Sequence, residues 1–456
     1  MADWAALRAR VDGEVILPAA PGYDAARRPA IARFHDVRPA AVVRCATPAD
    51  AAETLSYARR SGLRVAVRCG GHCFAGRSST EGIVVDVTPM NSVAVHDGTV
   101  TVGAGTRLGD LYDALAGHGV TIPAGCGPTV GIAGLTLGGG LGVLGRMYGL
   151  TCDGLRSAQV VLPGGRTIVC DERRDADLFW ALRGGGNGTV GVVTSLEFGT
   201  VPAPASTAFH LTWPYPAAAA VIQAWQAWSP DASDELAASL LISAAANTAR
   251  APVISVFGAM AGAEAACRTA LDELAARVGP PPASAAFRHG SHRQVKRYLS
   301  TLDVHGDGPR PDGVPTEDDG HAYSKSEFFA QTLPADAVAA LVDHLTRDRM
   351  PGQSRELDFT PWGGAYNRVP VEAAAFPHRD ARFLLKQAVV VDAGASAAER
   401  RAATRWLVRS WELAHRWGTG GVYPNFPDPD LPDPDAAYYG ANLPRLREVI
   451  RTYGRS

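Results

Sequence analysis

Three glycine-dense stretches set the strongest limit on how this chain can fold. They cover residues 65–76, 123–142 and 182–191, and the second holds eight glycines in twenty residues. Glycine has no side chain to bury and loses the most conformational freedom on folding, so such density makes a poor core. It suits a surface on which a flat, extended ligand lies against backbone. We therefore interpret the three stretches as one bed for one extended cofactor.

The first stretch predicts a strand that enters an anion-binding loop. Val65-Ala-Val-Arg-Cys-Gly-Gly-His-Cys-Phe-Ala-Gly76 starts with an alternating β-branched pattern, and 83–87 is the next expected strand. Glycines 70, 71 and 76 can take positive φ and approach a ligand closely. Successive backbone N–H groups in such a turn bind anions, and Arg68 can add charge at its mouth.

Length and charge narrow the class of protein. A chain of 456 residues favours two or three domains, and a net charge of −2 gives no reason to expect nucleic acid or an anionic membrane as partner. No apolar run approaches the roughly 18–20 residues that span a bilayer, and the N-terminus has no signal-peptide pattern. Seven scattered cysteines do not suggest a disulfide framework. We therefore expect a cytoplasmic protein with reduced thiols.

The pattern of elements predicts an α+β fold. The first 200 residues predict short strands at 14–17, 42–45, 63–68, 83–87, 157–162 and 166–170, a hairpin around Asp97-Gly98, and helices at 48–61 and 107–117. Beyond Pro204 we expect strands at 206–213, 252–260, 355–359 and 382–391, and helices at 216–229, 261–278, 334–347, 396–417 and 443–453. Residues 301–322, rich in Gly, Pro, Asp and His, predict a mobile surface loop. This alternation suggests a second domain with a mostly antiparallel sheet.

In this order and spacing, the glycine-rich stretches resemble the vanillyl-alcohol-oxidase/PCMH flavoproteins, and more closely their berberine-bridge-enzyme-like FAD-linked oxidoreductases. The similar segments are Arg68-Cys-Gly-Gly-His72, Pro128-Thr-Val-Gly-Ile-Ala-Gly-Leu-Thr-Leu-Gly-Gly-Gly140, Leu182-Arg-Gly-Gly-Gly186 and Tyr439-Gly-Ala-Asn-Leu-Pro-Arg-Leu446. The resemblance implies a two-domain PCMH-type FAD-binding fold with an antiparallel-sheet substrate domain. We expect an FAD-binding domain at 1–205, a substrate-binding domain at 206–400, and a C-terminal segment at 401–456 that returns to the FAD domain.

The resemblance also implies covalent FAD, because His72 matches the histidine that this family bonds to the flavin 8α-methyl group. Many relatives form a second link, to flavin C6, from a cysteine directly before Pro-Thr-Val-Gly. Here that position is Gly127, and Cys126 stands one residue earlier. A one-residue shift in an extended segment can turn a side chain to the other face, so we expect a single link through His72, with a link through Cys126 as the alternative. A zinc site at Cys69, His72 and Cys73 lacks a second ligand pair.

The residues that we expect to bind FAD come from the three stretches, the following strand and the C-terminal segment. They are Arg68, Cys69, Gly70, Gly71, His72, Cys73, Gly76, Cys126, Thr129, Val130, Gly131, Gly134, Gly139, Gly142, Val193, Tyr423 and Asn425.

Two tyrosines are candidates for the catalytic base. The family commonly uses a C-terminal Tyr-x-Asn-Tyr motif, which here reads Tyr423-Pro-Asn425-Phe426, without its second tyrosine. Tyr423 is one candidate, and Tyr366 is the alternative. A phenol of pKa about 10 must be lowered by some three units, roughly 4 kcal/mol, to act near neutrality. Lys386 could supply a cation for this, although a strand lysine more often points to solvent.

These features predict an FAD-dependent oxidase. It would transfer a hydride to flavin N5 from an alcohol, hemiacetal or amine of a sugar-bearing or secondary-metabolite-like substrate. Its partners would be that small molecule and O2, with H2O2 as product and no metal. The alternative is a flavoprotein that binds or sequesters a small molecule with little turnover, because Phe426 replaces the second tyrosine.

Overall fold

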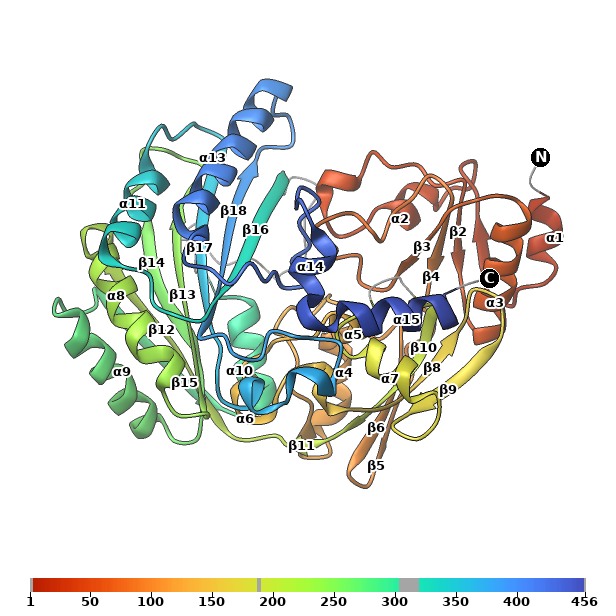
Figure 1. The fold of residues 1–456 in the computed structure, drawn as a ribbon, viewed down its shortest axis with the longest axis horizontal. Helices are drawn as coiled ribbons and strands as arrows, with labels where there is room; N and C mark the ends of the chain where they lie inside the picture. Colours follow the sequence, from red (N-terminus) through yellow and green to blue (C-terminus); the bar gives the residue numbers. More distant parts are fainter. Residues whose placement is uncertain (1–2, 187–189, 303–319, 455–456) are drawn as a thin grey trace.

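The computed structural model describes residues 3–186, 190–302 and 320–454, which form two halves lying side by side (Figure 1). Residues 187–189 of the third glycine-rich stretch, and 303–319 of the expected surface loop, lie outside the described residues.

A four-stranded sheet carries the first glycine-rich loop. Its order is β1 (Glu14–Ile16), β2 (Ala41–Arg44), β4 (Ile83–Asp86) and β3 (Val65–Arg68), and β2, β4 and β3 run parallel. Parallel neighbours need a crossover, which helix α3 (Pro48–Arg60) provides. Thr47 caps this helix, and Asp50 completes a capping box. The loop of interest therefore leaves the carboxyl end of an edge strand.

A five-stranded antiparallel sheet follows. Its order is β5 (Val93–His96), β6 (Thr99–Gly103), β10 (Val192–Gly199), β8 (Leu155–Val161) and β9 (Thr167–Asp171). The predicted hairpin joins β5 to β6, and Gly98 takes a φ of +73° in its turn. Buried Val100, Val102 and Leu196 join its inner face to the core of the first half.

The second half is a seven-stranded antiparallel sheet with helices on its outer face (Figure 1). Its strands, in order, are β15 (Ser284–Gly290), β12 (Ser206–Pro214), β14 (Val253–Ala261), β13 (Leu236–Ala244), β17 (Gln353–Pro361), β18 (Phe383–Val391) and β16 (His321–Phe329). The outer helices are α8 (Ala218–Trp228), α9 (Glu264–Val278), α11 (Ala335–Thr346) and α13 (Ala397–His415). Along β17, Leu357 and Phe359 pack into the core with these helices, while Asp358 points to the opposite face. The predicted α+β class and antiparallel second sheet are confirmed.

Three strands of this sheet escaped the sequence pattern. β15 is an edge strand with largely exposed side chains, β13 is rich in Ala and Ser, and neither shows a clear apolar alternation. β16 begins at His321, so the end of the loop expected at 301–322 was placed too late. Helix α10 (His292–Ser300) was also missed, as was α5 (Ile132–Leu137) inside the second glycine-rich stretch.

The C-terminal segment returns to the first half through α14 (Pro434–Tyr439) and α15 (Leu443–Tyr453). Helix α15 packs against α7 (Ala176–Leu182), and Arg445 pairs with Asp177 at 2.7 Å. The Asn442 amide donates to the carbonyls of Val371 and Ala374 at 2.8 and 3.0 Å. Domain boundaries near residues 205 and 400 stay a prediction.

The remaining elements are short. They are α1 (Trp4–Arg8), α2 (Tyr23–Arg27), α4 (Leu108–Ala116), β7 (Val120–Thr121), α6 (Gly145–Tyr148), β11 (Val201–Pro202), α12 (Ala365–Arg368), and 3-10 turns at Ala32–Phe34, Thr151–Gly154, Tyr215–Ala217, Ser229–Asp231, Val371–Ala373 and Gly440–Asn442. Among the described helices, none combines the length and apolar character needed to cross a bilayer.

Candidate active site

The first two glycine-rich stretches touch each other. A side chain on Gly70 would lie 2.5 Å from the Gly131 nitrogen, and one on Gly131 would meet the Cys69 sulfur. Gly71 and Gly76 take the predicted positive φ, at +74° and +70°. Gly70 does not, so that part of the prediction was wrong. At Gly70, glycine serves close backbone approach instead.

The loop between β3 and β4 keeps unused hydrogen-bond donors. In the described part of the chain, the backbone N–H groups of residues 71–75 donate to no other backbone group. The loop is largely half-buried, and a row of free N–H groups is the feature that binds anions such as a diphosphate.

His72 stands in this loop as a neutral imidazole. Its Nε2 lies 3.0 Å from the Thr129 hydroxyl, so the first stretch is tied to the second at this point. Burial, followed by the positive charge of Arg107, lowers the pKa of His72 to about 4. A neutral imidazole keeps a lone pair for bond formation.

Arg68 does not add charge to the loop, contrary to expectation. Its buried guanidinium donates to the carbonyls of Ala26 and Arg27 and so ties β3 to α2. Cys69 also packs internally, with its sulfur 3.8 Å from the Thr106 carbonyl, and burial raises its pKa to about 12.

The Tyr423 hydroxyl receives three hydrogen bonds. The backbone N–H groups of Gly140 and Leu141 donate to it at 2.9 and 3.1 Å, and the Asn425 amide donates at 3.2 Å. None of the described residues accepts the phenolic proton. Burial raises the pKa of Tyr423 to about 12, although the three donors act in the opposite direction. The expected lowering of this pKa is therefore absent from the protein alone.

Tyr366 is bonded differently. Its hydroxyl donates to the Gly142 carbonyl at 3.1 Å and accepts from the Gly142 N–H at 3.3 Å. Burial raises its pKa above the ordinary value. Its proton already has a backbone acceptor, so this tyrosine fastens the second half to the glycine-rich stretch.

Lys386 does not point to solvent. Its ammonium pairs with Asp358 at 3.0 Å and lies 5.3 Å from the ring centre of Phe426. Burial opposes its charge, but Asp358 and then Glu356 raise its pKa. Phe426 also contacts the ring of Tyr423 at 5.0 Å and that of Phe74 at 5.8 Å. An ion pair thus lies next to the aromatic side of the Tyr423 site.

Several other predicted cofactor residues differ in what surrounds them. Gly139 lies next to the Tyr423 ring, and Gly142 lies against the Ala124 carbonyl. Gly134 lies on α5, and a side chain added there would meet no protein atom within 4 Å. The others are Val130 and Cys73, half-buried, and Val193, buried in β10.

In the third glycine-rich stretch, packing against protein already accounts for Gly184–Gly186. Side chains there would collide with Phe376, Ala375 and Leu137 respectively. The Gly186 N–H also donates to the Leu137 carbonyl at 3.1 Å. The described part of this stretch therefore supports the second stretch rather than forming a third open surface.

The structure adds residues that sequence reasoning missed. Phe328, Trp362 and Phe376 form a buried aromatic cluster with Tyr423 and Tyr366. Beneath it, Arg379 forms a buried two-bond ion pair with Asp153, at 2.7 and 2.9 Å. The aromatic residues come from distant strands and loops, and no local spacing connects them.

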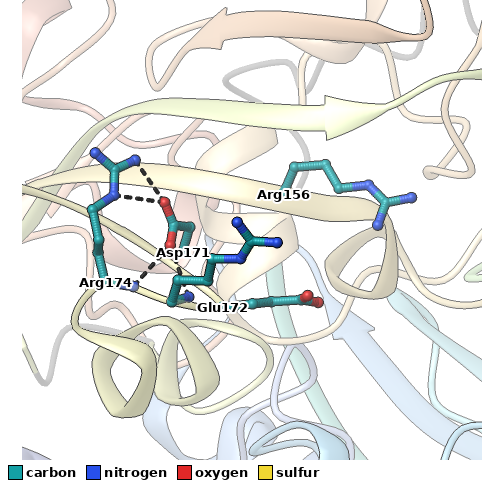
Figure 2. A pocket seen from close by; sticks show the side chains of 5 residues that line it. Arg156, Asp171, Glu172 and Arg174 are labelled. Carbon is teal, nitrogen blue, oxygen red and sulfur yellow. Dashed lines mark hydrogen bonds and ion pairs between the residues drawn. The ribbon is translucent and has the colours of Figure 1, made fainter.

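A surface pocket lies on β8 and at the end of β9 (Figure 2). It is lined by Arg156, Asp171, Glu172, Arg173 and Arg174. Arg174 pairs with Asp171 at 2.6 Å, and none of the predicted site residues lines this pocket.

The candidate site thus combines a half-buried loop of free N–H groups, a neutral histidine, and an open helical position at Gly134. The Tyr423 phenol, whose proton none of the described residues accepts, completes it. These are the features that a diphosphate-linked ring cofactor requires, and they fit FAD.

Comparisons with known proteins agree. Residues 39–171 match the family model described as FAD binding domain, and 422–453 match the one described as berberine and berberine like. An uncharacterized FAD-linked oxidoreductase of Bacillus subtilis, YvdP, is 30% identical, covering 97% of this chain and 96% of its own. A chitooligosaccharide oxidase of Gibberella zeae is 28% identical, covering 91% of this chain and 85% of its own.

Solved structures share the fold. A variant of Physcomitrella patens BBE-like 1 superposes with a TM-score of 0.88 at 24% identity, covering 98% of this chain and 96% of its own. A 6-hydroxy-D-nicotine oxidase from Arthrobacter nicotinovorans gives 0.82 at 26% identity, covering 97% and 95%. Fold and site define an FAD-linked oxidoreductase of the PCMH type. The chain belongs to the berberine-bridge-enzyme-like family.

Proposed function

We propose that the protein is an FAD-dependent oxidase. It oxidises an alcohol, hemiacetal or amine group of a sugar-bearing or secondary-metabolite substrate and reduces O2 to H2O2. The observation that carries this proposal is Tyr423, whose hydroxyl receives three N–H donors and whose own proton is unclaimed among the described residues. Relatives named as oxidases of chitooligosaccharides and of hydroxynicotine support both substrate types.

FAD, when bound, supplies a hydride acceptor at N5 and a route for electrons to O2. The protein's part begins with placement. The free N–H groups of residues 71–75 would hold the diphosphate, and His72 would anchor the ring from the same loop.

Proton removal falls to Tyr423 in this proposal. The donors from Gly140, Leu141 and Asn425 would stabilise the negative charge on its oxygen in the deprotonated form, which accepts the substrate proton. Burial raises the resting pKa of Tyr423 to about 12, so only a small fraction of its hydroxyl is in the basic form near neutrality, and this fraction grows with pH. The Tyr366 hydroxyl donates a hydrogen bond to the Gly142 carbonyl and so holds the site in place.

We further propose that flavin is attached once, through His72. Cys126 lies beside the buried Lys296 ammonium, which supports the expectation that the one-residue shift turns this thiol away from the ring. An intact mass of denatured protein with its visible spectrum tests this. One flavin that is lost in His72→Ala is the expected result, and retention of flavin in that variant would mean attachment through Cys126.

Turnover is tested by anaerobic mixing with a panel of sugars, alcohols and amines. The expected result is bleaching of the oxidised flavin by at least one class, followed by one H2O2 per substrate after O2 is admitted. Tight binding without bleaching across the panel would favour the second candidate, a sequestering flavoprotein. Phe426 in place of a second tyrosine, and the raised pKa of Tyr423, support that alternative.

All seven cysteines are free thiols. This supports the proposal that the protein works in a reducing compartment such as the cytoplasm.

A further inference from the structure

A cluster of buried ionisable groups joins α10 of the second half to the second glycine-rich stretch. Lys296 is 3% exposed. Its ammonium donates to the Tyr112 hydroxyl at 3.1 Å, to the Gly125 carbonyl at 3.1 Å and to the Ala124 carbonyl. A buried lysine with no carboxylate among these partners is costly to keep, so its retention calls for a function.

Cys126 is the further neighbour of this ammonium. Cys126 directly follows the two carbonyls that accept hydrogen bonds from this ammonium, and its side chain lies close enough to oppose the burial that lowers the pKa of Lys296. Cys126 is half-buried, so small molecules can reach it. Burial raises the pKa of five other thiols, Cys45, Cys69, Cys152, Cys170 and Cys267, which makes them poor nucleophiles.

His292 is a further buried polar side chain of this cluster. It is 4% exposed, and neither ring nitrogen has a hydrogen-bond partner among the described residues. Its ring meets that of Tyr112 edge-on, with centres 6.0 Å apart. Burial, with the neighbouring charge of Lys296, lowers its pKa to about 3, so the imidazole is neutral. A neutral imidazole offers one donor and one acceptor to a small polar molecule such as a peroxide.

We propose that Cys126 and Lys296 form a thiol–amine pair that hydrogen peroxide converts into a covalent sulfur–nitrogen link between the two halves of the protein. The source of peroxide in the cell would be the enzyme itself, and to that extent the inference rests on the proposed function. The link would fix α10 against the backbone of residues 124–126.

The chemistry proceeds in two balanced steps. The Cys126 sulfur attacks one oxygen of H2O2, an S–O bond forms as the O–O bond breaks, and water leaves. Sulfur is thereby oxidised by two electrons and peroxide is reduced. Lys296, after losing a proton to solvent, attacks the sulfenic sulfur through its nitrogen. The S–N bond forms, the S–O bond breaks and a second water leaves, with no further change in oxidation.

The test treats purified holoenzyme with added H2O2, so it does not depend on turnover. After removal of peroxide, free thiols are alkylated and the protein is digested without reductant. We expect a joined peptide containing Cys126 and Lys296, about 2 Da lighter than the sum of its parts, that separates on treatment with excess thiol. Cys73, also half-buried, serves as the internal control and should be recovered alkylated.

Lys296→Arg keeps the positive charge, but a guanidinium stays protonated and cannot attack the sulfenic sulfur. This variant should therefore give no joined peptide, with Cys126 recovered as sulfinic or sulfonic acid instead. The wild-type measurement stands alone if that variant fails to fold. Recovery of wild-type Cys126 as sulfinic acid, as an unmodified thiol or on a flavin-bearing peptide would each overturn the proposal. A positive cross-link in a protein that oxidises no substrate would leave this inference standing and remove the proposed function.

Discussion

Tyr366 and Tyr423 carry the same phenol, and both hydroxyls touch the backbone of residues 140–142. They differ in where their protons go. The Tyr366 hydroxyl donates a hydrogen bond to the Gly142 carbonyl, whereas the Tyr423 hydroxyl only accepts hydrogen bonds among the described residues. Sequence motifs could nominate both residues, but hydrogen bonds to backbone far along the chain separate their roles.

Replacing Tyr423 by Phe should lower kcat/KM by about 10²–10⁴-fold with flavin content unchanged, because it removes the proposed proton acceptor. In wild type, kcat/KM should rise with pH without a plateau below about pH 10, since the resting pKa is about 12. Tyr366→Phe is the control. It leaves the Gly142 groups unpaired, costs about 1–3 kcal/mol of unfolding free energy, and keeps the same pH profile. Equal kinetic losses in both variants would contradict these roles.

His378 should make the fold sensitive to acid. It stacks on Phe328 with ring centres 4.4 Å apart, and burial lowers its pKa to about 3, against about 6.5 in an unfolded chain. Between those values the unfolded state binds a proton that the native state does not, so stability falls as pH falls. At about pH 5 the loss is on the order of 2 kcal/mol. Urea unfolding at several pH values should show a shallower dependence in His378→Gln, and no change of slope in the exposed control His118→Gln.

Charged residues show the limit of local reading. The sequence predicts that Arg68 adds charge at the loop mouth, and for Lys386 it favours an orientation toward solvent over a role as a cation near the tyrosine. The structure turns Arg68 to the carbonyls of residues 26 and 27 and pairs Lys386 with Asp358. Partners distant in sequence decide both outcomes, and no spacing within a motif contains that information.

At the scale of elements, helix α5 offers a test of where the ring lies. Gly134→Ala adds a methyl group that meets no protein atom, and alanine should stabilise the flavin-free helix by about 1 kcal/mol. If Gly134 faces the cofactor, as proposed, flavin content should fall while that stability rises. Gly117→Ala, at another uncrowded helix position, should leave flavin content unchanged. Full flavin loading of Gly134→Ala would remove Gly134 from the cofactor site.

Element prediction succeeded where a signal was strong and local. The helix expected from residue 48 begins there, behind a capping box at Thr47. The Asp97-Gly98 turn joins β5 to β6 as expected. The sheet of the second half was recognised as antiparallel from four of its strands. β13 and β15 were missed because neither shows a clear apolar alternation, and β16 was missed because its start lies in the segment that was expected to be a loop.

Across the whole molecule, buried cations fasten the halves together. Arg146 of α6 donates to the carbonyls of Pro230, Ala232 and Trp362, all beyond residue 205. Arg379 and Asp153 add an ion pair with side chains 2% and 8% exposed. The two halves should therefore resist separation as rigid bodies.

Arg379→Met should cost about 3–5 kcal/mol of unfolding free energy, because it leaves the Asp153 carboxylate buried without its cationic partner. Arg382→Met is a matched control. Arg382 also makes two bonds to an aspartate, but these side chains are 30% and 62% exposed, so the loss should stay below about 1 kcal/mol. Urea denaturation of both variants measures the difference, and similar losses would show that burial does not decide the strength of these pairs.

Tyr423 lies in a segment that follows all the sheets described above in the chain, yet its hydroxyl accepts a hydrogen bond from backbone near residue 140. During synthesis on the ribosome, the loop that holds His72 and all strands of the seven-stranded sheet are made before Tyr423. An incomplete polypeptide therefore lacks the group that would start turnover. If the protein is the proposed oxidase, peroxide release would thus begin only after the segment with Tyr423 has been made and has folded onto the glycine-rich stretch.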